Sequence, residues 1–226
     1  MKKIFSSKYY LKKEIDYLLN KMYQVKVNFE LFKDIQSGEE KRYISDNTPT
    51  FSRIVLSALS KNIFLELSKI IVDTSDYQGM ENICIPNLIE KYSNNKDIFK
   101  LKKCYYVTGI DDNKKHKVNL SNQDVDSIIK KLSNKTNINN KVYKHLKTMR
   151  NKELAHNDKA FGFKTRKKYI KEIVTYKEIE DYINELYDDL NELNKSLFST
   201  TTVFRYEYKN ELKWLTEIIK NHIEEK

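Results

Sequence analysis

An arginine and a histidine in the second half of the chain have the types and the spacing for chemistry on a phosphodiester. Arg150 is followed by five residues and then by His156. An imidazole, with an ordinary pKa near ~6.5, accepts a proton at neutral pH. A guanidinium is permanently charged, and its N–H donors match phosphate oxygens. RNA carries its own nucleophile, the 2′-hydroxyl, so these two side chains suffice for strand cleavage. We therefore expect no metal and no cofactor.

Three neighbours of this pair are candidate members of the site. Asn151 is a candidate catalytic helper that would bind the phosphate or the sugar. Asp158 either accepts the other ring N–H of His156 and orients the imidazole, or belongs to the turn that ends a helix. Glu153 is a supporting residue that would pair with a lysine on the solvated face.

The pair also has a structural interpretation, in which Arg150 lies on a helix surface and His156 caps the last carbonyls. The geometry of a helix limits the alternative, catalytic interpretation. Six residues of ideal helix amount to ~9 Å of rise and roughly 120° of rotation, so the two side chains do not face one phosphate. Either the helix ends or bends before His156, or a second copy of the chain places its motif opposite the first. A two-fold contact needs only one self-complementary surface.

The positive charge of the chain is concentrated around this motif. Residues 141–171 contain eleven Lys or Arg and two acids, whereas the other residues contain 31 basic and 30 acidic side chains. Such a segment is typical of a protein that binds a polyanion, although lysine is common throughout the chain. Seven of its side chains are candidate contacts for the RNA backbone: Lys147, Lys152, Lys159, Lys164, Arg166, Lys167 and Lys168.

Aromatic residues alternate with these positive charges after the motif. Phe161, Phe163 and Tyr169 lie in the same stretch as the last four basic candidates. Stacking on unpaired bases together with phosphate attraction would suit single-stranded RNA, such as mRNA or a tRNA loop. The alternative is that the two phenylalanines pack beneath a loop.

The composition favours long helices and an intracellular protein. The chain has four glycines and two prolines, too few for the frequent turns of a β-sandwich or barrel. It has no apolar run near the ~18 residues of a membrane span and no signal peptide. Cys84 and Cys104 are too few for a disulfide scaffold, so we interpret both as reduced thiols of a cytoplasmic protein.

Apolar residues recur every three or four positions, which predicts helices that must position the motif. Pro49 suits a first helical turn, Asn139 or Asn140 begins the motif helix, and Thr175 with Glu178 forms a capping box. Residues 101–120 are interpreted as irregular, although 104–107 have a strand-like composition. The expected helices are 10–35, 49–73, 85–92, 121–132, 140–150, 176–197 and 206–226.

These helices predict an all-α fold in a single domain, residues 1–226. It is a bundle of five to seven helices with a long basic loop after the motif helix. An N-terminal helix, 8–36, and a C-terminal helix, 205–224, pack on a core of residues 49–198.

The ten residues from Met149 to Asp158 resemble the signature of the HEPN superfamily, an arginine and a histidine separated by four to six residues. The fuller pattern Arg-Asn-Lys-x-x-Ala-His-x-Asp is similar to the abortive-infection branch, and residues 65–73 are similar to its second helix. The resemblance implies an HEPN-like bundle, a homodimer with a composite cleft, and metal-independent RNA cleavage that leaves a 2′,3′-cyclic phosphate.

Three functional hypotheses follow. The first is an RNA endonuclease toxin of phage defence or of a toxin–antitoxin pair, with a cognate antitoxin as a further partner and no membrane association. The second is a non-catalytic HEPN module that binds nucleotides or RNA or serves a partner enzyme. The third is a helical interaction protein. Salt separates it from the others, since nucleic-acid binding weakens steeply between ~50 and ~200 mM.

Overall fold

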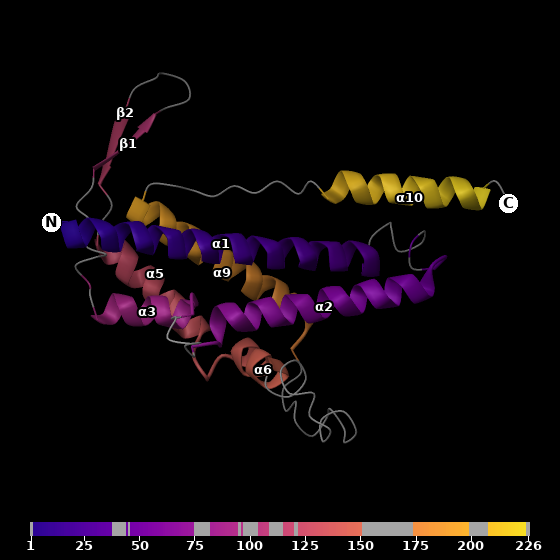
Figure 1. The fold of residues 1–226 in the computed structure, drawn as a ribbon, viewed down its shortest axis with the longest axis horizontal. Helices are drawn as coiled ribbons and strands as arrows, with labels where there is room; N and C mark the ends of the chain where they lie inside the picture. Colours follow the sequence, from indigo (N-terminus) through magenta and orange to yellow (C-terminus); the bar gives the residue numbers. More distant parts are fainter. Residues whose placement is uncertain are drawn as a thin grey trace.

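The computed structural model describes residues 2–37, 44, 46–74, 82–94, 96, 104–108, 115–119, 122–150, 174–198 and 208–224. Over these residues the chain forms a helical bundle with one small hairpin (Figure 1). The elements are α1 (Lys2–Ser37), α2 (Pro49–Ile71), α3 (Ile85–Asn94), β1 (Cys104–Thr108), β2 (Lys115–Asn119), α5 (Asn122–Lys135), α6 (Lys141–Met149), α9 (Tyr176–Phe198) and α10 (Tyr208–Glu224). The predicted HEPN-like bundle is confirmed.

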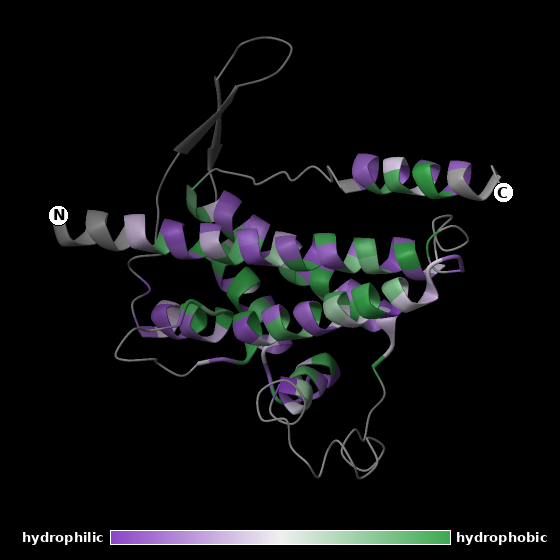
Figure 2. Cartoon of the chain, turned by 45° about the vertical axis from the view of Figure 1, so that its right-hand side comes forward, coloured by the Kyte–Doolittle hydropathy of each residue, from purple (hydrophilic) through white to green (hydrophobic). Residues whose placement is uncertain are grey.

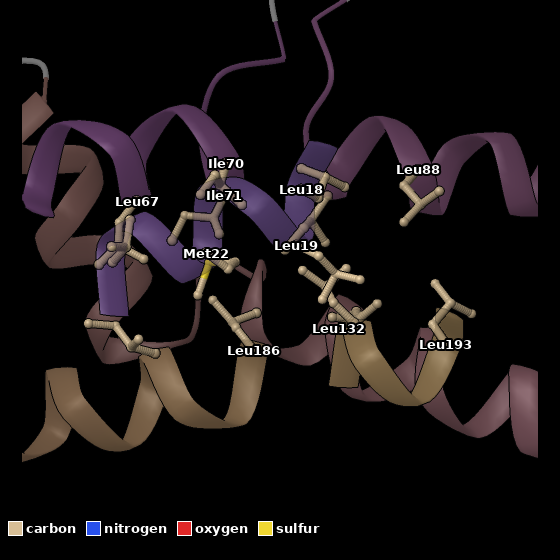
Figure 3. Close-up of a cluster of buried hydrophobic side chains, with 14 of the residues drawn as sticks. Leu18, Leu19, Met22, Leu67, Ile70, Ile71, Leu88, Leu132, Leu186 and Leu193 are labelled. Carbon is tan, nitrogen blue, oxygen red and sulfur yellow. The ribbon is translucent and has the colours of Figure 1, made fainter. Parts of the chain in front are cut away.

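Three long helices, α1, α2 and α9, form the centre of the bundle, with α3 and α5 at one end and α6 against α2. Figure 2 shows apolar and polar residues alternating along these helices, because each buries one face and exposes the other. Side chains from α1, α2, α3, α5 and α9 meet in one core (Figure 3). Its fully buried members include Leu18, Met22, Leu67, Leu132 and Leu186.

Two helix starts follow the sequence closely. Pro49 lies in the first turn of α2, as expected. Thr175 and Glu178 form the predicted capping box at the start of α9. The backbone N–H of Thr175 donates to Glu178 Oε2 at 2.7 Å, and that of Glu178 donates to Thr175 Oγ1 at 3.2 Å. Each side chain thus satisfies an N–H that the helix leaves unpaired.

The motif helix, α6, begins at one of the two asparagines proposed for that role. Asn140 is the N-cap, and its side-chain oxygen accepts a hydrogen bond from Tyr143 N at 3.1 Å. The cap sets the first turn of α6, so Val142 and Leu146 are buried. Buried residues at this spacing fix which side of α6 meets the bundle.

Part of the region interpreted as irregular is a hairpin. β1 and β2 pair antiparallel, with Cys104 opposite Asn119 and Thr108 opposite Lys115. Tyr105, Tyr106 and Val107 favour extended backbone, and the antiparallel ladder pairs the backbone N–H and C=O groups of alternate residues. The interpretation of residues 104–108 and 115–119 as irregular was therefore wrong, and the helical bundle carries one two-stranded addition.

The start of α1 and the end of α2 differ from the expected helix ends. α1 begins at Lys2 rather than at residue 8, whereas the predicted start of α10 at residue 205 lies outside the described residues. α2 ends at Ile71, so Asp73 lies beyond it rather than within it.

In α10, Leu212 packs with Ile35 and Ile44 in a small cluster separate from the main core. None of the described helices is long and apolar enough to cross a membrane.

Candidate functional site

Arg150, the first residue of the predicted catalytic pair, lies at the end of α6. Its backbone is still helical, with φ −56° and ψ −48°, and its N–H donates to the carbonyls of Leu146 and Lys147. The helix therefore extends through the arginine, which leaves both geometric remedies open: a bend after Arg150, or a second copy of the motif.

The guanidinium of Arg150 forms an ion pair with Asp73, through Nη2 and Oδ1. Asp73 belongs to the turn that follows α2, so the pair joins the end of one helix to the end of another. The arginine side chain is 30% exposed and the aspartate 23% exposed. Both charges are thus held at the margin of the bundle, in reach of a ligand from solvent.

The α2–α6 contact beside this ion pair is well defined. Ser68 is fully buried on α2, and its Oγ lies 3.5 Å from the carbonyl oxygen of Leu146. One turn earlier, the ring of Phe64 packs on the ring of His145, with centroids 5.8 Å apart. These contacts fix the direction from which α6 presents Arg150.

The other end of α6 is tied to α9. Lys141 Nζ donates to Glu178 Oε1 at 2.6 Å, next to the capping box. This bond, and then the backbone N–H of Thr175, lowers the pKa of Glu178 to about 2. Because hydrogen bonds to a carboxylate favour its charged form, Glu178 stays ionised over the whole neutral range. α6 is therefore anchored at both ends by charged pairs.

Two of the predicted site residues lie within the described part of the chain. Arg150 is one, and Lys147 is the other. Lys147 is exposed, and its amine lies 6.0 Å from the centroid of the Tyr143 ring. The other predicted site residues, and the basic loop, lie outside the described residues: Asn151, Lys152, Glu153, His156, Asp158, Lys159, Lys164, Arg166, Lys167 and Lys168. The aromatic candidates Phe161 and Phe163 lie outside them too.

A separate open groove of about 460 Å³ lies between α1 and α2. Polar side chains dominate its lining, and Lys21 forms an ion pair with Glu66 there at 3.1 Å. It contains none of the predicted site residues. Among the described residues, no group of three or more His, Cys, Asp or Glu side chains could hold a metal ion.

A family model for AbiU2, of the HEPN class, matches residues 9–214, from the first turns of α1 into α10. The chain belongs to the HEPN AbiU2 family. The resemblance to the abortive-infection branch is thereby confirmed over nearly the whole bundle, not only over the ten residues of the motif. Neither the curated proteins nor the solved structures contain a match to the chain.

The partner of Arg150 had no assigned role at the sequence level. Asp73 closes the run of residues 65–73 that resembles the second helix of the abortive-infection branch, but its sequence surroundings resemble those of any acid at a helix end. The two residues are 77 positions apart, and only the packing of α2 against α6 brings them together. No feature of the sequence marked Asp73 as a member of the site beforehand.

Proposed function

We propose that this AbiU2-family protein is a metal-independent RNA endonuclease that acts in phage defence or in a toxin–antitoxin pair. The observation that carries the proposal is the placement of Arg150. Its guanidinium lies at the margin of the bundle in an ion pair with Asp73, and Arg150 is the first residue of a motif with the right residue types. An oriented cation at the protein surface is what stabilisation of a phosphorane-like transition state requires.

The proposed reaction is an internal transesterification. His156 accepts the proton of the ribose 2′-hydroxyl, whose oxygen attacks the adjacent phosphorus, and the bond from phosphorus to the 5′-oxygen breaks. The leaving 5′-oxygen takes up a proton from water, so the products are a 2′,3′-cyclic phosphate and a 5′-hydroxyl, and the protonated imidazole returns its proton to solvent. Arg150 balances the charge that develops on the phosphoryl oxygens, and Asn151 assists in binding the phosphate or sugar.

The remaining site residues have supporting roles in this proposal. The seven basic candidates attract the phosphate backbone, Asp158 orients His156, and Glu153 pairs on the solvated face. A homodimer would place two motifs across a two-fold axis, so that the arginine of one copy meets the histidine of the other. We further propose a cytoplasmic location, where mRNA and tRNA are the available substrates.

The test is incubation with total tRNA and mRNA in EDTA, followed by analysis of the product ends. We expect the wild type to leave 2′,3′-cyclic phosphates and 5′-hydroxyls. His156→Ala and Arg150→Ala should each lower the cleavage rate by about a hundredfold or more. The matched control is Arg53→Ala, because Arg53 is exposed on α2 near the end opposite to Asp73. Undiminished cleavage by His156→Ala would refute the assignment, and RNA binding without cleavage by the wild type would favour a non-catalytic module.

A further inference from the structure

The geometry points to Asp73 as a positioning residue for Arg150. We propose that its carboxylate holds the guanidinium in the orientation that receives a phosphate oxygen, an inference that rests on the proposed nuclease function. The carboxylate acts through the arginine and does not itself contact the reacting atoms.

The position of Asp73 is fixed by the backbone at the end of α2. The N–H groups of Val72 and Asp73 both donate to the carbonyl of Ser68, at 2.8 and 3.2 Å. Ser68 is also the buried residue whose hydroxyl approaches Leu146 on α6. One residue of α2 thus fixes both the turn that carries Asp73 and the contact with the helix that carries Arg150.

A fixed carboxylate is useful to an arginine in particular. The arginine side chain is long and loses several rotatable bonds when it is ordered, so an unsupported guanidinium spends much of its time in unproductive orientations. Its five N–H donors allow it to bind a carboxylate on one side while offering others to a phosphate oxygen. The ordering is then completed before RNA binds, which is the general advantage of preorganisation.

The charge of the pair is the second part of the argument. Among the described residues from Lys141 to Arg150, every formally charged side chain is positive. Asp73 lies in the turn after α2 and is 23% exposed, so it places a negative charge against this end of α6. A carboxylate that served solubility or simple charge balance would not need to contact the motif arginine.

The test uses Asp73→Asn, which keeps the shape of the side chain and removes its charge. We expect kcat for RNA cleavage in EDTA to fall by roughly tenfold to a hundredfold, with a smaller change in KM, because misorientation costs most in the transition state. Asp73→Glu keeps the carboxylate and should recover part of the loss. In an Arg150→Lys background, Asp73→Asn should cause little further loss, because the group that it positions is gone.

The matched control is Glu14→Gln. Glu14 joins α1 to α3 through an ion pair with Lys91 at 2.8 Å, and its side chain is 21% exposed, close to the exposure of Asp73. It should lose as much thermal stability as Asp73→Asn but none of the kcat. Three results would overturn the proposal: wild-type kcat in Asp73→Asn, faster cleavage by it, as expected if the carboxylate competes with phosphate, or an equal loss in the Arg150→Lys background.

A second measurement separates this proposal from the nuclease function. RNA methylated at every 2′-oxygen has no nucleophile, so its affinity for the protein, measured by fluorescence anisotropy near ~50 mM salt, does not depend on cleavage. We expect Asp73→Asn to weaken binding severalfold in the wild type and not in the Arg150→Lys background. If the wild type fails to cleave RNA, the nuclease proposal fails, and this measurement alone decides the role of Asp73. Equal affinities of wild type and Asp73→Asn would then overturn it.

Discussion

Two of the ion pairs that link helices in this bundle have different surroundings. Lys135 of α5 and Asp189 of α9 lie 2.7 Å apart, with side chains 14% and 9% exposed. Arg150 and Asp73 join the ends of α6 and α2 and are about twice as exposed or more. The first pair is largely enclosed, whereas the second is partly exposed to solvent.

The enclosed pair is part of the interior of the protein. Tyr182 of α9 donates its hydroxyl to the carbonyl of Lys135 at 2.9 Å, and burial raises the pKa of that hydroxyl, so it remains a donor. A buried pair contributes little net stability, but removing one partner leaves an uncompensated charge. A partly exposed pair costs little free energy to break, so one of its two charges can bind a ligand instead. We therefore expect a substitution in the α5–α9 pair to lower stability, and one in the α2–α6 pair to affect the proposed RNA cleavage instead.

Substitutions in the two contacts should have opposite effects on RNA cleavage and on stability. This difference is the largest effect that we expect. Arg150→Ala should lower RNA cleavage by about a hundredfold or more and the free energy of unfolding by under about 1 kcal/mol. Asp189→Ala should leave kcat unchanged and lower the free energy of unfolding by about 2 to 3 kcal/mol, less than for a fully enclosed pair. The loss is smaller than for a fully enclosed pair because the carboxylate of Glu185 remains 3.3 Å from the Lys135 amine. Urea unfolding and cleavage assays on both variants measure the two quantities, and loss of both properties in both variants would break the comparison.

Asn194, also on α9, gives a second test of how this helix contributes to the stability of the fold. It is fully buried, and neither its amide nitrogen nor its amide oxygen has a hydrogen-bond partner among the described residues. Asn194→Leu should therefore raise the free energy of unfolding by about 1 kcal/mol, since it removes the cost of an unsatisfied polar group.

The control for this variant is a buried asparagine that has a partner. Asn87 donates to the carbonyl of Asn82 at 2.8 Å, so Asn87→Leu should lower the free energy of unfolding. Urea denaturation of both variants is the measurement. A loss of stability in Asn194→Leu would mean that its amide makes a contact that the leucine removes.

The smallest expected effect concerns the tie between α6 and α9 and appears in acid. The folded-state pKa of Glu178, about 2, lies below its ordinary value of 4.5, so its stabilising contribution is present above pH 4.5 and is lost as the pH falls from 4.5 toward 2. Glu178→Gln should flatten the dependence of unfolding free energy on pH in that interval. Lys141→Met should do the same, because Lys141 is the main cause of the lowered pKa. Curves parallel to that of the wild type would contradict the tie.

The bundle could be predicted from the sequence because its information is local and periodic. The apolar spacing of α9, its capping box and the proline of α2 all depend on residues within a few positions of one another. The hairpin was missed because strand pairing joins segments that the sequence does not mark as partners. Tyr105 and Val118, for example, are paired across the ladder.

The candidate site was predictable in its residue types and not in its support. Arg150 could be selected because an arginine separated by five residues from a histidine is a chemical pattern in one short segment. Asp73 could not, because its role depends on where α2 ends and on how α6 packs against it. A helix boundary that shifts by two residues decides whether that carboxylate belongs to the helix or to the turn.

The tie between Lys141 and Glu178 also bears on how such proteins can diverge. The chain leaves α6 at Arg150 and enters α9 beside Glu178, and the nine residues of α6 separate these two points. Because the bundle holds Arg150 and Glu178 in place, doubling the length of the chain between them costs only ~0.6 kcal/mol of loop-closure entropy. We therefore expect insertions and deletions in the stretch beyond the motif to be tolerated while the same scaffold is inherited.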